Sequence, residues 1–394
     1  MEIHKGLGQW IVLGRYEFFS IFPACEQKKE CKPMPLRVHP TIASLTPYSP
    51  GKPLDELERE LGITQAIKLA SNENPWGPSP NALQVLAGAA ASLHRYPDGG
   101  AHYLRQALAE RWKVSDDQVL VGNGSDEIIS LLVRAFLSPG DEAVMADLTF
   151  VMYKLSVLGG HGVPVEVPLK NWVHDIAAMV DAVTDRTRLF FLCNPNNPTG
   201  TMLTAREIDG FLSQLPDHVV VVFDEAYYEY VRHPDFPDSL QYVRDGRPVV
   251  VLRTFSKIYG LAGLRVGYGY TTKEIAGYVN RVRPPFNVNS LAQEAARAAL
   301  SDDDHVAKSR AMNEAEMMFL QERLITMGLE PVPSQANFLY FNVGIDGRRA
   351  YDALLREGVI VRHIRGPMLR VTIGQPTENR RFLESLARVL PMLS

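Results

Sequence analysis

The sequence has little cysteine, little net charge and no long apolar run, and each shortage excludes a class of protein. Its 394 residues include three cysteines, Cys25, Cys31 and Cys193. So few thiols, in an odd number, argue against a disulfide framework and are typical of a chain kept in a reducing cytoplasm. The formal net charge of −4 gives no electrostatic reason to expect a nucleic-acid partner. No window approaches the roughly 18 apolar residues of a membrane span, so we expect no membrane partner.

Nucleotide and metal motifs are missing as well. The glycine-rich segment VGNGSDEII at 121–129 is neither a Walker loop nor a GxGxxG fingerprint, so ATP and NAD are poor candidates. Cys25 and Cys31 have no histidine or cysteine partners at ligand spacing. We therefore expect no metal site.

The first 33 residues lack the features of the rest of the chain. They have one short apolar stretch without clear periodicity, and a secretory signal would need a longer one with a small-residue cleavage site. We expect residues 1–35 to be a disordered extension. We also hypothesise that the native protein starts at Met34, so that a chain beginning there would keep full activity and stability.

From residue 118 onward, short apolar segments alternate with amphipathic ones. Their near-continuous Val and Leu runs are typical of strands covered on both faces of a mostly parallel sheet. A helix is expected at 125–136, opened by Ser125 and acidic in its first turn. The alternation predicts an α/β fold, with a mostly parallel mixed sheet between helices. The expected strands are 118–122, 142–147, 163–169, 188–193, 219–226, 249–255 and 264–270.

The pattern changes after residue 290. Segments 290–300 and 303–327 have helical periodicity, and Met317 and Met318 are interpreted as core residues rather than ligands. Beyond them, two strand-like pieces flank a helix, which predicts a smaller α+β domain. The expected limits are 36–70 for an N-terminal arm and part of the small domain, 71–328 for the large domain and 329–394 for the small C-terminal domain.

Lys257 lies in RTFSKIYGLAGLRVGYG, residues 253–269, at the end of an expected strand. A Schiff-base lysine must be fixed in place and kept partly deprotonated by desolvation or neighbouring cations. The hydroxyls of Thr254 and Ser256, with Arg265 eight residues on, suit a phosphate dianion. Taken alone, a lysine after a strand is more often a solvated strand end.

Asp224 ends the very apolar strand in VVVVFDEAYYEY, residues 219–230. A carboxylate there is costly to bury without a cation, and a pyridinium nitrogen is such a cation. The alternative is an aspartate that caps a turn. Tyr227 lies three residues further on, within reach of a ring oxygen.

Two further turns follow expected strands. LCNPNNPTG, residues 192–200, contains two Asn–Pro steps that fix the backbone and would present the amide of Asn197 to a ring oxygen. In the turn at 121–129, Gly124 allows close backbone approach, and the amides of Ser125 and Asp126 would face an anion.

In this order and spacing, GNGSDE, NPNNPTG, DEAY and TFSKxYGLAGLRxGY resemble the fold-type I, class II pyridoxal-phosphate-dependent aminotransferases, and most closely the histidinol-phosphate aminotransferases. The resemblance covers roughly residues 36–394. It implies a pyridoxal 5′-phosphate cofactor bound to Lys257, with Asp224 on the pyridine nitrogen, and Asn197 and Tyr227 on the phenolic oxygen. The implied phosphate and ring contacts are Gly124, Ser125, Asp126, Thr254, Ser256, Arg265 and, stacked on the ring, Phe150.

The same resemblance extends to the substrate and to a second subunit. Arg370 matches an arginine that binds the glutamate carboxylate and, in the other half-reaction, the substrate phosphate. Arg362 and Tyr48 match further phosphate contacts. Tyr96 matches a tyrosine that reaches the cofactor phosphate of the neighbouring subunit, which implies a homodimer with shared sites.

The function implied is transfer of an amino group from L-glutamate to imidazole acetol phosphate, a step of L-histidine biosynthesis. An aromatic amino-acid aminotransferase and a threonine-phosphate decarboxylase would share the catalytic residues and stay open as alternatives. A cofactor-sensing regulator would need a basic DNA-binding domain, for which 33 unpatterned residues are too few. A catalytically silent scaffold disagrees with the filled catalytic positions.

Overall fold

The computed structural model describes residues 37–47 and 51–393. The expected extension at 1–35, with Cys25 and Cys31, lies outside the described residues, and so does Tyr48. Among the helices formed by the described residues, none is both long and apolar enough to cross a membrane.

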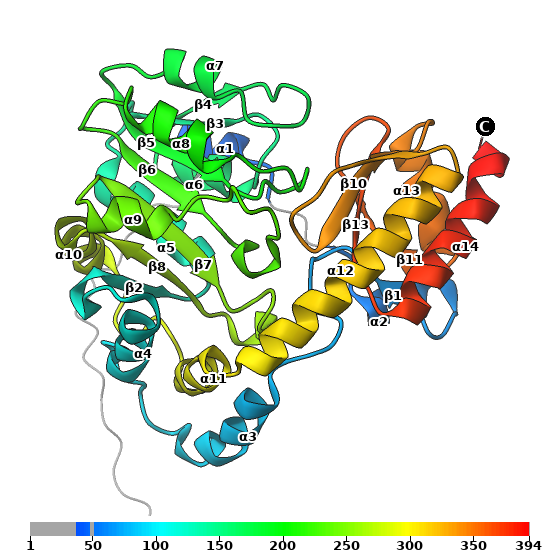
Figure 1. The fold of residues 1–394 in the computed structure, drawn as a ribbon, viewed down its shortest axis with the longest axis horizontal. Helices are drawn as coiled ribbons and strands as arrows, with labels where there is room; N and C mark the ends of the chain where they lie inside the picture. Colours follow the sequence, from blue (N-terminus) through cyan, green and yellow to red (C-terminus); the bar gives the residue numbers. More distant parts are fainter. Residues whose placement is uncertain (1–36, 48–50, 394) are drawn as a thin grey trace, which may run out of the picture. The chain divides into compact units, whose positions relative to one another are not determined.

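Seven strands form the central sheet (Figure 1). In spatial order, they are β2 (Val119–Gly122), β8 (Gly267–Thr271), β7 (Val249–Thr254), β6 (Val220–Asp224), β5 (Thr187–Cys193), β3 (Glu142–Ala146) and β4 (Val163–Val167). Every strand runs parallel to its neighbours except β8, which is antiparallel to β2 and β7. All seven expected strands are present, and the predicted mostly parallel mixed sheet is confirmed.

Helices cover both faces of this sheet, because its strands alternate their side chains between two apolar cores. In β6, Val220 and Val222 contribute to one core, and Val221 and Phe223 to the other. The first core packs on α5 (Ser125–Phe136), α6 (Met152–Gly159) and α10 (Lys273–Val282). The second packs on α3 (Pro80–Ala89), α4 (His102–Trp112), α7 (Ile176–Asp181), α8 (Ala205–Leu212), α9 (Ser239–Arg244) and α11 (Ser290–Leu300).

A smaller antiparallel sheet forms a separate core. Its strands follow the order β12 (Arg362–His363), β13 (Met368–Thr372), β10 (Phe338–Asn342) and β9 (Glu330–Val332). With it pack α13 (Gly347–Arg356) and α14 (Pro376–Leu393). The N-terminal part of the chain joins this region, since β1 (Ile67–Lys68) pairs in parallel with β11 (Val359–Ile360), and Leu57 of α2 (Leu54–Leu61) packs near Ile360. The short helix α1 (Pro40–Ser44) contacts α6 instead.

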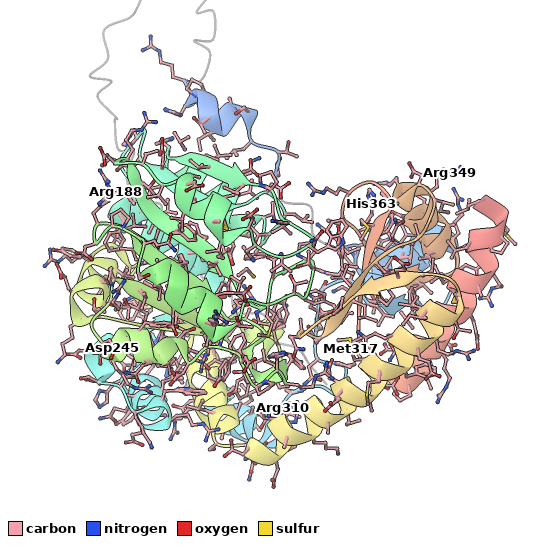
Figure 2. All side chains as sticks on the ribbon, turned by 45° about the horizontal axis from the view of Figure 1, so that its top comes forward. Arg188, Asp245, Arg310, Met317, Arg349 and His363 are labelled. Atoms are coloured by element: carbon pink, nitrogen blue, oxygen red, sulfur yellow. The ribbon has the colours of Figure 1, made fainter. Side chains whose placement is uncertain are left out.

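The long helix α12 (Asp303–Thr326) belongs to both regions. Near its start, Arg310 Nε donates to the backbone oxygen of Glu229 at 2.6 Å, whereas Met317 lies in the core of the small sheet (Figure 2). The expected domain limit at 328 lies two residues after the end of this helix. The domain limits stay a prediction. The interpretation of Met318 as a core residue is wrong: its side chain is 55% exposed and is not part of the small-sheet core.

Candidate functional site

The carboxyl ends of parallel strands bring the expected site residues to one edge of the central sheet. Cys193 at the end of β5 lies opposite Asp224 at the end of β6, and Thr254 ends the neighbouring β7. Ligands of open α/β sheets bind outside this edge. Here a cavity of about 190 Å³ opens between the edge, segment 70–72 and two arginines of the small sheet.

The cavity collects nearly all of the site residues expected from the sequence. It is lined by Gly124, Ser125, Asp126, Phe150, Asn197, Asp224, Tyr227, Thr254, Ser256, Lys257, Arg265, Arg362 and Arg370. Tyr96 does not line it within one chain: this side chain is 82% exposed and stacks on Phe286 with ring centroids 4.7 Å apart. The roles assigned to these residues stay predictions, but their convergence in one cavity is observed.

Lys257 is held by the backbone of the segment that leads to the small domain. Its Nζ donates to the carbonyl oxygen of Ser71 at 3.1 Å. Burial, and next the positive charge of Arg370, lower the pKa of Lys257 to about 8. The neutral, nucleophilic amine is therefore much more populated near neutral pH than it is in an exposed lysine.

Asp224 is a buried carboxyl group, 3% exposed. Its oxygens accept hydrogen bonds from Tyr153 Oη at 2.7 Å and from the backbone N–H of Ala226 at 3.2 Å. Burial raises the pKa of Asp224 to about 6. Because both donors are neutral, a cationic ring nitrogen in the cavity would stabilise the ionised carboxylate, so this carboxyl group fits a pyridine-containing cofactor.

Another part of the cavity lining suits an anion. Gly124 has φ +78°, and a Cβ on it would lie 2.7 Å from Nη2 of Arg265, so glycine is required for the guanidinium to lie there. A Cβ on Gly267 would lie 2.2 Å from the backbone nitrogen of Ser125, so β8 also approaches this turn closely. The 12-residue helix α5 begins at Ser125. A helix N-terminus and a guanidinium, next to the hydroxyl-bearing Ser256, form a site suited to phosphate.

Two arginines of the small sheet line the same cavity as Lys257 and Asp224. Arg370 on β13 lies directly opposite Arg362 on β12. Arg370 Nη1 donates to Asn197 Oδ1 at 2.5 Å, and Nη2 to the backbone oxygen of Ala70 at 2.6 Å. Since Oδ1 of Asn197 accepts from Arg370, the amide nitrogen of Asn197 remains the group able to donate to a ring oxygen.

Two residues at this site were not expected from the sequence. Asn72 is buried with φ +55°, and its Nδ2 donates to the Tyr227 hydroxyl at 2.8 Å, while its Oδ1 accepts from Thr372 Oγ1 at 3.1 Å. An asparagine tolerates this left-handed backbone, but the sequence around Asn72 does not reveal that its side chain bonds to Tyr227. Tyr153 is the second; it lies one residue inside the start of α6, and nothing in the local sequence distinguishes it from a core aromatic residue.

No cluster of three or more histidine, cysteine or acidic side chains suited to a metal ion occurs within residues 37–47 and 51–393.

The sheet topology and the cavity at its edge define a class, the fold-type I aminotransferases. More narrowly, the chain belongs to the class I and II aminotransferase family, whose model matches residues 64–386. This confirms the family inferred from the four motifs.

Known proteins are similar to this chain over about nine tenths of its length. A histidinol-phosphate aminotransferase of Moorella thermoacetica is 51% identical over 356 residues, which cover 89% of this chain and 92% of the relative. Histidinol-phosphate aminotransferase 2 of Pseudomonas fluorescens is 50% identical, with 89% and 96% covered. Among solved structures, the histidinol-phosphate aminotransferase of Sinorhizobium meliloti in complex with pyridoxal-5′-phosphate has a TM-score of 0.84 at 29% identity, covering 91% of this chain and 98% of that one.

Proposed function

We propose that this chain is a pyridoxal-phosphate-dependent histidinol-phosphate transaminase of L-histidine biosynthesis. It transfers the amino group of L-glutamate to imidazole acetol phosphate, giving 2-oxoglutarate and L-histidinol phosphate. The observation that carries the proposal is the single cavity in which Lys257, Asp224 and Arg265 converge with Arg362 and Arg370. The similarity to histidinol-phosphate aminotransferases at about half identity supports the same assignment.

Each end of the cavity has a distinct task in this proposal. Pyridoxal 5′-phosphate, when bound, supplies an electron sink that stabilises negative charge at the substrate α-carbon. Asp224 holds the protonated pyridine nitrogen, and Asn197 and Tyr227 donate to the phenolic oxygen. Lys257 would hold the cofactor aldehyde, and its neutral amine would move the proton at the substrate α-carbon.

The remaining contacts hold the cofactor and exclude water from it. The N-terminal amides of α5 bind the cofactor phosphate together with Thr254, Ser256 and Arg265. Phe150 covers the face of the ring. These groups are fixed before substrate arrives, which orients the reacting atoms at no further entropic cost.

The two small-sheet arginines divide the substrate recognition. Arg370 binds the carboxylate of glutamate and the phosphate of the second substrate in alternation, because both anions accept its planar fork. Arg362 binds the phosphate alone. A single site can therefore serve both half-reactions in turn.

The proposal includes a homodimer and a cytoplasmic location. The stacked pair Tyr96 and Phe286 is exposed in the single chain, at 82% and 45%, and so is available to a second copy. Tyr96 would then reach the cofactor phosphate of the neighbouring subunit. The three cysteines among 394 residues suit a reducing compartment.

The test follows the visible absorbance of the cofactor-loaded protein after addition of L-histidinol phosphate, phenylalanine, tyrosine or threonine phosphate. We expect the absorbance to change far faster with histidinol phosphate than with the others. A faster response to the aromatic amino acids would assign the chain to aromatic amino-acid transamination. Carbon dioxide release from threonine phosphate would assign it to decarboxylation.

Arg362→Ala sharpens the test of substrate class. It should raise the KM for histidinol phosphate far more than the KM for glutamate, because only the former has a phosphate. Arg348→Ala, a surface substitution on α13, is the matched control and should change neither. Equal effects of Arg362→Ala on both substrates would contradict the assigned phosphate contact.

A further inference from the structure

Tyr153 lies behind the cofactor cavity and does not line it. The side chain is fully buried near the start of α6, in the apolar core between that helix and the sheet. Its hydroxyl donates to Asp224 Oδ2 at 2.7 Å. A buried hydroxyl that donates to a carboxylate has a direction that is fixed by that acceptor.

The ring of Tyr153 is fixed on two further sides. It stacks on Phe191 of β5 with centroids 4.7 Å apart and planes 6° from parallel. It also meets Phe150 edge-on, at 5.6 Å and 85°, and its backbone N–H donates to the Phe150 carbonyl at 3.2 Å. One side chain therefore contacts both the carboxylate and the aromatic ring that line the cavity.

Resting on the proposed function, we propose that Tyr153 is a positioning residue for the cofactor, which acts through Asp224 and Phe150 without touching the cofactor itself. Its O–H bond holds the Asp224 carboxylate in its ionised form and in one rotamer. Its ring holds Phe150 against the position of the cofactor ring.

The charge balance around Asp224 gives Tyr153 its importance. Burial raises the pKa of this carboxyl group, and the hydrogen bond from Tyr153 is the largest of the influences that lower it. Burial also raises the pKa of the Tyr153 hydroxyl well above its usual range, so the hydroxyl keeps its proton and remains a donor. The titratable groups that act on Asp224 or respond to it are Asp126 of α5, Cys193 of β5, Glu225, Tyr227 and Lys257.

The experiment measures the dissociation constant of pyridoxal 5′-phosphate from the apoprotein at pH 8 and pH 6, without any substrate. For Tyr153→Phe we expect affinity about 10- to 100-fold weaker, the usual effect of a lost hydrogen bond to a charged group. Without the donor the pKa of Asp224 rises further, so a larger fraction is protonated at pH 6. The ratio of variant to wild-type dissociation constants should therefore increase as the pH falls.

Tyr268→Phe is the matched control, because Tyr268 is equally buried and its hydroxyl has no hydrogen-bond partner among the described residues. It should leave the affinity and its pH dependence unchanged. In an Asp224→Asn background, Tyr153→Phe should add little to the loss, since the ionised acceptor is gone.

Tyr153→Phe with wild-type affinity at both pH values would overturn the proposal, as would a loss equal to that of Tyr268→Phe. A lower thermal midpoint alone, with unchanged affinity, would show a merely structural role. Should Tyr153→Phe fail to fold, 4-fluorophenylalanine at this position fills the same space without an O–H and permits the same comparison. Because no amino donor is used, these outcomes are independent of which substrate the protein accepts.

Discussion

Arg253 is one of the largest side chains that the fold buries completely, at 1% exposure. Its Nε donates to Glu225 Oε2 at 2.9 Å, and its Nη2 lies 2.8 Å from the same oxygen. The guanidinium carbon lies 3.4 Å from the ring centroid of Tyr228 and 4.2 Å from that of Trp112. A buried charge in this setting depends on its ion pair with Glu225 and on its aromatic neighbours.

We expect Arg253→Met to destabilise the protein by about 3–5 kcal/mol, because it leaves the Glu225 carboxylate buried and unpaired. Urea unfolding monitored by circular dichroism gives the change. Arg297→Ala breaks the exposed pair with Glu294 and should cost only about 0–1 kcal/mol. Equal losses in the two variants would contradict the importance assigned to burial.

Lys257 provides a prediction about pH. Burial and the neighbouring Arg370 lower its pKa to about 8, so the amine becomes neutral at a lower pH than an exposed lysine does. The initial rate at which the apoprotein binds pyridoxal 5′-phosphate covalently should rise with pH up to about 8 and then level off. Stopped-flow absorbance measures this rate.

Arg370→Gln should move the plateau to higher pH, because it removes a positive charge that disfavours the protonated amine. Lys257→Ala should show no covalent binding at any pH. A wild-type rate that continues to rise towards pH 10 would be inconsistent with the lowered pKa.

At the scale of single elements, α12 shows how far a periodic pattern predicts structure. Its helical spacing placed Met317 correctly in a core but did not separate it from the neighbouring Met318, since adjacent helical positions differ by about 100° and only the packing partners decide. Met317, Leu320 and Leu324 pack on the small sheet. The helix therefore stabilises a region that its position in the sequence places outside the expected small domain.

These adjacent methionines provide a matched pair. Met317→Ala should cost about 2–5 kcal/mol through lost burial and a residual cavity. Met318→Ala, at a side chain 55% exposed, should stay within about 0.5 kcal/mol of wild type. Thermal unfolding of both variants checks the prediction, and a larger loss for Met318→Ala would contradict the packing of α12.

At the scale of the whole molecule, the proposed homodimer predicts complementation between subunits, because Tyr96 of one subunit would reach the site of the other. Neither Lys257→Ala nor Tyr96→Ala homodimers should be fully active. In a mixed dimer, the Lys257 of one subunit would meet the intact Tyr96 of the other, so one site of two is restored. Equal mixing after reversible unfolding should then recover about a quarter of wild-type activity, since about half of the dimers are mixed in a symmetric association.

Transaminase assays of the mixture and of each variant alone measure this recovery. Lys257→Ala mixed with a Lys257→Ala, Tyr96→Ala double variant is the control and should recover nothing. No gain over the Tyr96→Ala variant alone would contradict a shared site.

The sequence alone predicted the strands and the family, and it named most of the residues that line the cavity, whose roles stay predictions. These features are local: runs of buried valine and leucine specify the strands, and turns such as NPNNPTG directly follow them. Because the carboxyl ends of parallel strands lie at one edge of the sheet, the residues that follow them necessarily lie close together. The start of β8 was placed three residues early, since Arg265 adopts φ +57° before the strand begins at Gly267.

Only the tertiary structure determined the contacts made across long sequence separations. Asn72 meets Tyr227 and Thr372, and Tyr153 meets Asp224, through pairings that no local pattern encodes. The lowered pKa of Lys257 likewise depends on burial and on Arg370 from the small sheet. Desolvation and long-range charge are properties of the packed molecule, whereas the residue types that respond to them are already written in the sequence.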